Sequence, residues 1–407
     1  MLLLNLLIQS LLYLISAYLL FNCIYLLFFS VAGHKKIKRI NPQESTKGYR
    51  KFCVLIPAYR EDNVILETSQ AALSHTYQGE FDVVVIADGL MPATIHKLKQ
   101  QGSKVVEVFF DKSTKGKALA WALDSLPENE YDVAVVLDVD NLMGANFLEE
   151  VNNAFAAGYK VVQAHRTAKN MDSAFALLDA CNEEINNHIF RKGHFAIGMS
   201  SSLIGSGMAF EYRYFKKLLV GIGETVGEDK EIDIRISKDE VKICYLDKVY
   251  VYDEKIENAQ VFTKQRTRWI ATQVEFVQKY AVDGMLHFFR HKNIEYFDKV
   301  LQSIVLPRTF LAGILGFFFL LSFAIPYAPS TLFWAGLLVG FCIAMFLALP
   351  RKLYNRHLLF AMIRLPYALF CMCAALLRIN TTKSSFLPTP HKAKAIPSNT
   401  DKQTIKH

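Results

Sequence analysis

The sequence has few cysteines for its length, and they form no pattern that binds zinc. Seven cysteines occur among 407 residues, without a Cys-x-x-Cys pair and without a Cys and His group at zinc-site spacing. Four of the seven lie in the apolar blocks at the two ends of the chain. We therefore expect reduced thiols that pack as small apolar side chains.

The glycine-rich fingerprints of common nucleotide-binding proteins are also missing. Residues 115–117, Lys-Gly-Lys, lack the upstream glycine and the following Ser or Thr of a P-loop. The glycines of residues 221–227 have the wrong spacing for a dinucleotide site. We interpret these glycines as turns.

A strong excess of basic charge is absent as well. The net charge is +8, and the basic residues are scattered or flank the apolar ends of the chain. No basic helix is interleaved with stacking aromatic residues, so we expect no nucleic-acid partner. Lys and Arg beside apolar segments more often reflect membrane topology and anionic lipid.

Residues 1–32 contain no charged side chain and are long enough to span a bilayer. A signal peptide would carry its positive charge before the apolar run, whereas here the basic residues follow it, from His34 to Arg39. The positive-inside rule then places this end in the cytoplasm and the N-terminus outside. We predict an integral protein of the plasma or inner membrane, with an uncleaved anchor over 1–32, a basic linker over 33–50 and a cytoplasmic domain over 51–280.

A second apolar block covers residues 303–379. Two spans are predicted, over 306–328 and 332–349, with prolines between them. The stretch 358–377 contains Arg364 and Pro366 and is basic at both ends, so it is either a third span or an interfacial helix. We favour the interfacial helix, which leaves the tail 380–407 cytosolic.

Residues 281–302 mix aromatic and basic side chains, most clearly from Met285 to Gln302. This pattern predicts an amphipathic helix at the membrane interface, although an ordinary surface helix has the same pattern.

Residues 51–137 alternate between strand-like and helix-like patterns. Strands are expected at 51–57, 81–87, 104–109 and 132–137, and helices at 62–75 and 115–126. This alternation predicts an α/β fold with a mostly parallel sheet covered by helices. Ligands bind beyond the carboxyl ends of such strands, where the chain has 58–60 (Ala-Tyr-Arg), 88–89 (Asp-Gly) and 138–140 (Asp-Val-Asp). That placement suits a nucleotide.

Asp138 and Asp140 follow a buried strand pattern, two residues apart. Carboxylates at this spacing can serve a hard divalent cation, Mg²⁺ or Mn²⁺, which would also bind a diphosphate. The alternative is a local turn in which the aspartates and Asn141 cap the backbone.

Two further motifs carry candidate chemistry. Glu228 and Asp229 could deprotonate an acceptor hydroxyl, or could merely be the acidic first turn of a helix. Residues 265–269, Gln-Arg-Thr-Arg-Trp, could bind a diphosphate through arginine and a sugar ring through the indole. The alternative there is a helix with a solvated Arg-rich face and a buried Trp.

Taken in order, these motifs resemble the membrane-bound family 2 glycosyltransferases, the group of cellulose, chitin, hyaluronan and poly-N-acetylglucosamine synthases. The resemblance covers about residues 51–275. It is carried by seven segments: 57–61 (Pro-Ala-Tyr-Arg-Glu), 88–89 (Asp-Gly), 115–118 (Lys-Gly-Lys-Ala), 138–140 (Asp-Val-Asp), 205–207 (Gly-Ser-Gly), 228–229 (Glu-Asp) and 265–269 (Gln-Arg-Thr-Arg-Trp).

The resemblance implies a GT-A nucleotide-diphospho-sugar transferase domain, with a Rossmann-like mixed sheet flanked by transmembrane helices, and inverting transfer by direct displacement. Asp229, in the Glu228-Asp229 motif, would be the general base, and Asp138 and Asp140 would hold the metal. The implied donor-binding residues are Tyr59, Glu61, Asp88, Lys117, Asp138, Gln265 and Arg268. The implied acceptor-binding residues are Trp269, Gly205, Ser206 and Gly207.

The expected function is transfer from a UDP-sugar, UDP-N-acetylglucosamine or UDP-glucose, to a growing β-linked polysaccharide of the cell envelope at the cytoplasmic membrane face. The alternative is a single transfer to a lipid-linked acceptor. A binding subunit with a degenerate catalytic domain is disfavoured, because the catalytic aspartates and the Gln-Arg-Thr-Arg-Trp motif occur together. Two departures from the family stand out: Arg60 replaces a frequent Asn, and fewer membrane helices are available than in polymer synthases. The shortage of helices suggests a homodimer, an export partner or non-processive transfer.

Overall fold

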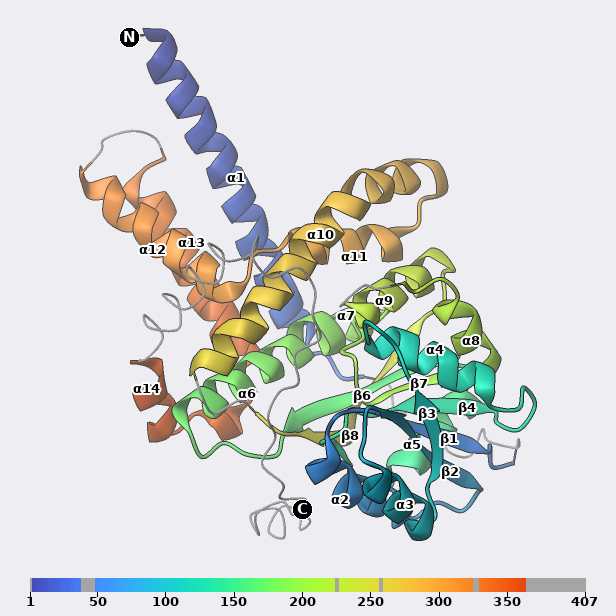
Figure 1. The fold of residues 1–407 in the computed structure, drawn as a ribbon. Coiled ribbons are helices and arrows are strands. Elements are labelled where there is room, and N and C mark those ends of the chain that lie inside the picture. Colours follow the sequence, from blue (N-terminus) through green and yellow to red (C-terminus); the bar gives the residue numbers. More distant parts are fainter. Residues whose placement is uncertain (1, 38–47, 224–226, 256–258, 325–328, 364–407) are drawn as a thin grey trace.

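A computed structural model gives the fold of the chain and describes residues 2–37, 48–223, 227–255, 259–324 and 329–363 (Figure 1). A long N-terminal helix precedes an α/β domain, and further helices follow it. The strands are β1 (Phe52–Tyr59), β2 (Phe81–Asp88), β3 (Lys104–Val108), β4 (Val133–Val136), β5 (Leu142–Met143), β6 (Val161–Ala168), β7 (Met208–Glu211) and β8 (Ile243–Asp253).

The helices of the α/β domain lie between these strands. They are α2 (Asp62–Leu73), α3 (Pro92–Gln101), α4 (Lys115–Ser125), α5 (Phe147–Ala156), α6 (Ala174–Asn186), the π-helical η2 (Asn187–Gly193), α7 (His194–Ala196), α8 (Tyr212–Leu219) and α9 (Glu228–Lys238). The other helices are α1 (Leu2–Ala32), α10 (Ala259–His291), α11 (Ile294–Ile304), α12 (Arg308–Ala324), α13 (Thr331–Ala348), the 3₁₀ turn η3 (Arg351–Leu353) and α14 (Arg356–Met362).

The eight strands form one mixed sheet in the order β3-β2-β1-β4-β7-β6-β8-β5. The first four are parallel, as the alternating sequence pattern predicted. β7 is antiparallel to both neighbours, and β5 is antiparallel to β8. Tyr59 and Asp88 are register partners at the ends of β1 and β2, so the polar residues after these strands meet at one sheet edge.

Both faces of the sheet are covered by helices, because successive side chains of a strand point to opposite faces. Val54 and Ile56 of β1 pack on the side of α2, α3 and α5, whereas Cys53 and Leu55 pack on the side of α4, α8 and α9. All four side chains are fully buried. Each stabilises the fold by roughly 1–3 kcal/mol, which explains why near-continuous apolar runs mark these strands in the sequence.

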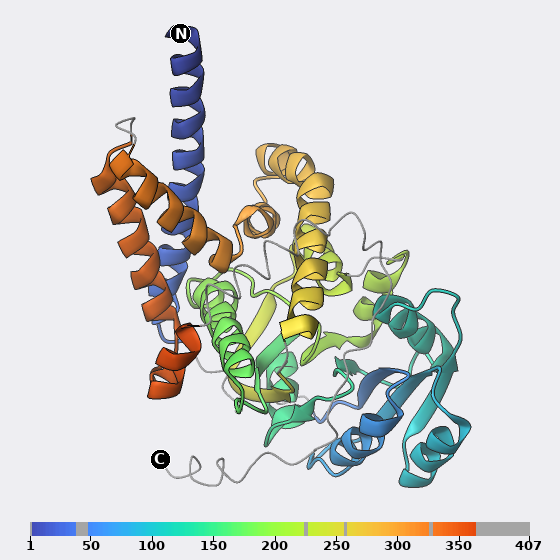
Figure 2. The same cartoon turned by 60° about the vertical axis from the view of Figure 1, so that its left-hand side comes forward.

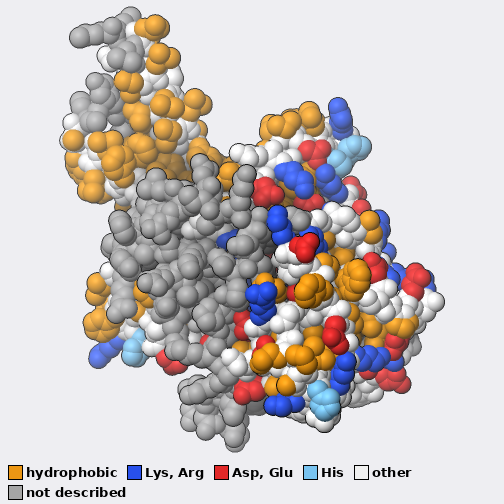
Figure 3. All heavy atoms as spheres, in the orientation of Figure 1, with side chains coloured by type: hydrophobic (Ala, Val, Ile, Leu, Met, Phe, Trp, Pro, Cys, Tyr) orange, Lys and Arg blue, Asp and Glu red, His pale blue; other side chains and the backbone are white. Residues whose placement is uncertain are grey.

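α1, α12 and α13 form a separate apolar cluster that projects from the domain (Figure 2). α1 and α13 lie side by side, and the His34 ring contacts the carbonyl of Leu347 at 2.9 Å. Hydrophobic side chains dominate the visible surface of this projection, whereas charged side chains are interspersed over the domain (Figure 3). An apolar surface of this extent is typical of membrane contact.

Within the described ranges, two helices are long and apolar enough to cross a membrane, over Asn5–Ala32 and Thr331–Ala348. α11 and α12, bent by 60° at a short break, would make a third if they act as one broken span. Which face each end of these helices occupies stays a prediction. Most of the predicted linker, the stretch 364–377 and the predicted cytosolic tail 380–407 lie outside the described residues.

The prediction of one helix from Met285 to Gln302 was wrong. This segment forms the end of α10 and most of α11, and the chain turns between them. Lys292 adopts a left-handed conformation with φ 59°, and the Asn293 side chain accepts a hydrogen bond from the backbone N–H of Tyr296. This N-cap starts a new helix and so breaks the amphipathic pattern.

Candidate active site

A large cavity opens at the carboxyl edge of the sheet and continues to the apolar helices. Its volume is about 1810 Å³. The polar end is lined by residues that follow β1, β2 and β4, and the other end by apolar side chains of α12, α13 and α14. The α/β domain and the projecting helices therefore enclose one continuous space.

Tyr59, Glu61 and Asp88 all line the polar end of the cavity, where donor-binding residues were expected. Asp88 is buried, and this burial raises the pKa of its carboxyl, while Ser113 and Arg60 act in the opposite direction. Arg60 adopts a left-handed conformation with φ 55°, and its backbone N–H donates to the Asp88 carbonyl at 3.0 Å. The turn after β1 is thus joined to the end of β2.

Asp138 and Asp140 both line the cavity, on a turn fixed by its neighbours. The backbone N–H of Asp138 donates to the Ser206 hydroxyl at 2.9 Å. One carboxylate oxygen of Asp140 accepts from the backbone N–H of Glu254 at 2.8 Å, and the other accepts from the Asn141 side chain at 3.0 Å. The backbone group that Asp140 accepts from belongs to Glu254, so this carboxylate oxygen joins the turn to a distant segment of the chain and does not cap the local backbone.

Within the part of the chain that the structure describes, no three His, Cys, Asp or Glu side chains gather as a metal site. Two carboxylates that line the same cavity, two positions apart in the sequence, still fit a Mg²⁺ or Mn²⁺ ion that would complete its shell with diphosphate oxygens and water. Asp138 and Asp140 are the residues that would hold it.

The structure brings Lys115 into the cavity in place of Lys117, which lies outside the lining. The Lys115 ammonium forms an ion pair with Asp138 and donates to the Gly205 carbonyl at 2.6 Å. The Lys117 ammonium instead points to the carbonyl of Lys112 at 3.4 Å. Lys115 was missed because the sequence motif does not reveal which of its two lysines faces the site.

Asp229 lies in the first turn of α9, partly exposed at the cavity wall. Gly205 has φ 82°, and a Cβ there would lie 3.5 Å from the Asp229 carboxylate. Gly227 precedes α9, and a Cβ at this position would clash with the methyl group of Thr272 on α10. Glycine at these two positions therefore leaves space around the Asp229 carboxylate and lets α9 approach α10.

Glu228 is buried beside Asp229, and its ionisation is strongly altered. Burial raises the pKa of its carboxyl to about 7; Lys115 opposes this change, and Asp229 adds to it. Glu228 therefore exchanges a proton near neutral pH, whereas an exposed glutamate would be ionised there.

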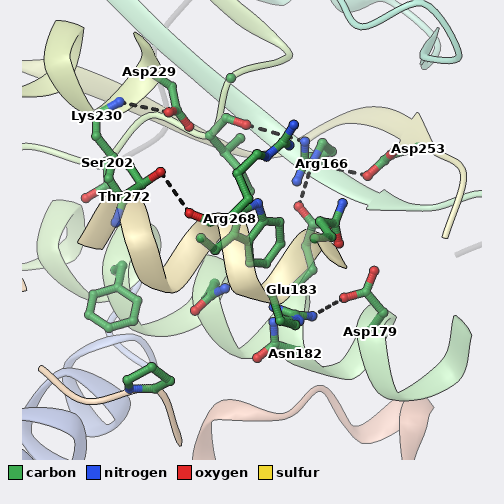
Figure 4. Close-up of a pocket in the computed structure, with 18 of the residues that line it drawn as sticks. Arg166, Asp179, Asn182, Glu183, Ser202, Asp229, Lys230, Asp253, Arg268 and Thr272 are labelled. Atoms are coloured by element: carbon green, nitrogen blue, oxygen red, sulfur yellow. Dashed lines mark hydrogen bonds and ion pairs between the residues drawn. The ribbon is translucent and has the colours of Figure 1, made fainter. Parts of the chain in front are cut away.

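The Gln-Arg-Thr-Arg-Trp motif lies on α10, and Gln265, Arg268 and Trp269 line the cavity. The side-chain oxygen of Gln265 is buried without a hydrogen-bond partner among the described residues, so a donor group of a ligand would satisfy it. Trp269 is 37% exposed, which leaves part of its ring available for stacking. Asp229 and Arg268 lie on neighbouring helices around the pocket (Figure 4).

Arg266 of the same motif is a structural residue. Its guanidinium forms an ion pair with Asp179 of α6 and lies 4.3 Å from the Trp269 ring. This stacking holds the indole against α10 and is worth about 0.5–2 kcal/mol. The alternative of a buried Trp and a solvated Arg-rich face does not describe these residues, because Trp269 is exposed and Arg266 is buried.

Of the three small residues expected to bind acceptor, only Gly205 lines the cavity. Ser206 is fully buried, and its hydroxyl bonds to Asn141 and to the backbone of Asp138. A Cβ at Gly207 would lie 3.0 Å from Val251, inside the sheet. Ser206 and Gly207 therefore shape the turn that carries Asp138 and do not face a ligand.

A buried group of ion pairs beside Asp138 was not anticipated. Arg166 lies 2.6 Å from Glu183 and 3.4 Å from Asp253 (Figure 4). It also lies 3.7 Å from Asp138. Lys255 pairs with Glu183 and lies 2.7 Å from Asp253. Burial alone would raise the pKa of Asp253, but Lys255 and Arg166 hold it below its usual range. These residues come from four separate segments, so no local sequence motif predicts their contacts.

The fold and this site define the chain as a glycosyltransferase. Residues 50–272, just over half of the chain, match the family model described as glycosyltransferase like family 2. The chain belongs to this family, and its mixed α/β sheet is of the GT-A type.

Individual relatives match over a similar share of the chain. The chain is 24% identical over 264 residues to the probable glycosyltransferase YdaM of Bacillus subtilis, which covers 61% of this chain and 60% of that protein. It is 25% identical over 231 residues to the beta-monoglucosyldiacylglycerol synthase of Synechocystis, covering 55% and 48%. The matched region therefore spans about half to three-fifths of these curated relatives.

One solved structure with a similar arrangement is the mannosyltransferase PcManGT of Pyrobaculum calidifontis, in complex with GDP-Man and Mn²⁺. The TM-score is 0.49 at 14% identity, and the alignment covers 81% of this chain and 98% of that chain.

Proposed function

We propose that the protein is a metal-dependent, inverting glycosyltransferase that transfers a sugar from a UDP-sugar to a lipid-linked acceptor at the cytoplasmic face of the membrane. The observation that carries this proposal is that one continuous cavity is lined both by Asp138, Asp140 and Asp229 and by apolar side chains of α12, α13 and α14. A donor can enter at the sheet edge while an acceptor enters from the membrane side.

In the proposed reaction, Asp229 takes the proton of an acceptor hydroxyl as its oxygen attacks the anomeric carbon of the donor sugar. The new bond joins that carbon to the acceptor oxygen, the bond to the diphosphate breaks on the opposite side, and UDP leaves. The configuration at the sugar carbon is therefore inverted.

The other residues would orient the donor and hold its leaving group. Tyr59 and Asp88 would bind the nucleotide from the polar end of the cavity, and Arg268 and the side-chain N–H of Gln265 would bind the diphosphate from α10. A Mg²⁺ or Mn²⁺ ion held by Asp138 and Asp140 would neutralise charge on the departing diphosphate. Lys115 would supply further positive charge from the same wall.

The lipid-linked acceptor is favoured by the apolar end of the cavity, which includes Phe341, Met345 and Leu349 of α13. By its name, the Synechocystis relative is a synthase of a glucosylated diacylglycerol, and this likewise favours a lipid acceptor. A growing β-linked polysaccharide remains the second candidate, because the partly exposed Trp269 offers a stacking surface for a sugar ring. Export of such a polymer would call for a second copy of the chain or a partner channel.

The test uses the full chain in nanodiscs with Mg²⁺ or Mn²⁺. UDP-glucose and UDP-N-acetylglucosamine are each supplied, UDP release is measured, and the lipid fraction is examined for added sugar. Metal-dependent UDP release with one sugar added to a lipid supports the proposal. A ladder of long products would instead establish the polysaccharide candidate. No release from any UDP-sugar, by a protein that still binds UDP, would contradict the proposed donor.

A further inference from the structure

Arg308 occupies the boundary between the polar and the apolar parts of the cavity. It is the first residue of α12, and Ala312, one helical turn later, lines the apolar part. The Arg308 guanidinium donates to the Asn186 side chain at 2.8 Å and to the backbone and side-chain oxygens of Asn182. These partners are neutral, and no carboxylate of the described residues lies within ion-pair distance of Arg308.

Arg191 adds a second cation without a counter-ion to the same wall. It is 5% exposed, and one guanidinium nitrogen donates to the Asn187 side chain at 2.9 Å. Its Nε atom is buried and has no hydrogen-bond partner among the described residues, and none of their carboxylates forms an ion pair with it. Burial lowers the pKa of this arginine, and the nearby carboxylates Glu183 and Asp233 only partly oppose that change.

Other cations of this wall are held in ion pairs. Arg166 and Lys255 pair with Glu183 and Asp253, and Arg266 pairs with Asp179. Among the described residues, Arg191 and Arg308 form no such ion pair, and their hydrogen bonds go to neutral asparagines. Arg308 also lies within range of repulsion from Arg191 and Arg266.

A desolvated cation without a counter-ion is costly, whereas an arginine that meets a phosphate forms strong, charge-assisted hydrogen bonds. The unsatisfied Nε of Arg191 and the guanidinium of Arg308 therefore indicate an anionic ligand. Because apolar residues of α12 and α13 continue the cavity from Arg308, the ligand must also carry a hydrocarbon chain.

We propose that Arg308 and Arg191, with Asn182 and Asn186, form a binding site for the phosphate of a lipid, whose hydrocarbon chain lies along α12 and α13. This inference rests on the proposed function, since it specifies the acceptor as a phosphate-linked lipid. The site is distinct from that of the donor diphosphate, because the hydrogen bonds of Arg308 go to α6 and not to the sheet edge beside Asp138.

The experiment measures binding of decyl phosphate to the full chain in detergent by native mass spectrometry, which counts bound molecules. Decyl phosphate should bind in one copy. Decanol and inorganic phosphate should each bind at least tenfold more weakly, because each lacks half of the ligand. Saturating UDP with Mn²⁺ should not displace decyl phosphate.

Two substitutions test the named residues. Arg308→Gln should weaken decyl phosphate binding at least tenfold, whereas Arg290→Gln, at an exposed arginine of α10, should leave it unchanged. Asn186→Asp is the more specific test, because it places a carboxylate 2.8 Å from the Arg308 guanidinium. The new side chain has nearly the same size as asparagine and supplies the missing counter-ion. This variant should fold with an unchanged or higher Tm and still lose decyl phosphate binding at least tenfold.

The inference is overturned if Asn186→Asp binds decyl phosphate as well as the unchanged protein does. It is also overturned if inorganic phosphate binds equally well, which would indicate a plain anion site, or if UDP displaces decyl phosphate, which would indicate the donor site. UDP-sugar turnover by the same preparations separates the two proposals. Phosphate-lipid binding without any sugar transfer would contradict the proposed reaction alone, and sugar transfer to lipid without phosphate-lipid binding would contradict the site alone.

Discussion

The ammonium group of Lys299 lies 3.1 Å from the carboxylate of Asp233, and both side chains are almost fully buried. Asp233 is one helical turn beyond Asp229 on α9. Lys299 also donates to the Ser201 carbonyl at 2.6 Å and to the Ser202 hydroxyl at 2.8 Å. One lysine of α11 thus joins the helix of the proposed base to the segment that leads into Gly205.

Replacing Lys299 with Met should destabilise the protein by about 3 kcal/mol, because it leaves a buried carboxylate without its counter-ion. The measurement is the Tm of the full chain in detergent. Lys248→Met, at an exposed lysine of β8, is the control and should leave the Tm unchanged. Adding Asp233→Asn to Lys299→Met should recover part of the loss; strictly additive effects would show that the two residues do not interact.

The first half of the sheet could be predicted from the sequence, whereas the second half could not. β1 to β4 are short, near-continuous apolar runs that end in polar residues, so their positions and parallel order follow from the pattern. β5 has two residues and β7 has four, and their antiparallel pairing depends on contacts with strands that are distant in the sequence. A two-residue strand carries too little pattern to be recognised alone. β7 is as short as β4, but it does not belong to the alternating strand and helix pattern that predicted β4.

The candidate site shows the same division. Asp138, Asp140 and Asp229 line the cavity, as the sequence led us to expect. The spacing of Asp138 and Asp140 pointed to a metal, and the family resemblance pointed to Asp229; their roles stay predictions. The assignment of Lys117 was less successful, because side chains two positions apart on a helix point in different directions, and only the packing of α4 selects Lys115. The contacts of Arg166 with Glu183 and Asp253 arise only when β6, α6 and β8 come together.

Asp229→Asn should reduce sugar transfer at least a thousandfold, because an amide cannot accept the proton of the acceptor hydroxyl. UDP binding with Mn²⁺ should stay within about threefold of the unchanged protein, since Asp229 is placed on the acceptor side. The measurement pairs UDP release with calorimetric titration of UDP. Asp239→Asn, at the far end of α9, is a matched control that should keep full activity. Transfer by Asp229→Asn at more than a tenth of the normal rate would rule out Asp229 as the base.

Asp140→Asn should weaken UDP binding at least tenfold in Mn²⁺, because the amide is a poorer ligand for a hard cation than the carboxylate. The substitution keeps an oxygen that can accept the hydrogen bond from the backbone of Glu254, but it loses the oxygen that accepts from the Asn141 side chain. The Tm of the variant is therefore compared with that of the unchanged protein. UDP binding in EDTA serves as the internal control and should be equal in the two proteins. Equal UDP affinity in Mn²⁺ as well would show that Asp140 does not hold the metal.

Glu228 should make the stability of the protein depend on pH, because burial raises the pKa of its carboxyl from 4.5 to about 7. Below pH 4.5 the carboxyl is protonated in the folded and unfolded states and carries no penalty. Between pH 4.5 and 7 the unfolded chain loses this proton while the folded protein keeps it, so stability falls as pH rises, by roughly 3 kcal/mol in total. Above pH 7 both states are ionised and the penalty stays constant.

Glu228→Gln removes this ionisation, so its free energy of unfolding relative to the unchanged protein should rise by roughly 3 kcal/mol between pH 4.5 and 7.5. Chemical unfolding of both proteins in the same detergent at several pH values measures the difference. Glu275→Gln, at an exposed glutamate of α10, is the control, and its difference should not change with pH. A pH-independent difference for Glu228→Gln would mean that Glu228 stays ionised in the folded protein. The effect of Lys115 on the pKa of Glu228 would then have to outweigh the effect of burial. Glu228 could not in that case serve as a proton-carrying neighbour of Asp229 near neutral pH.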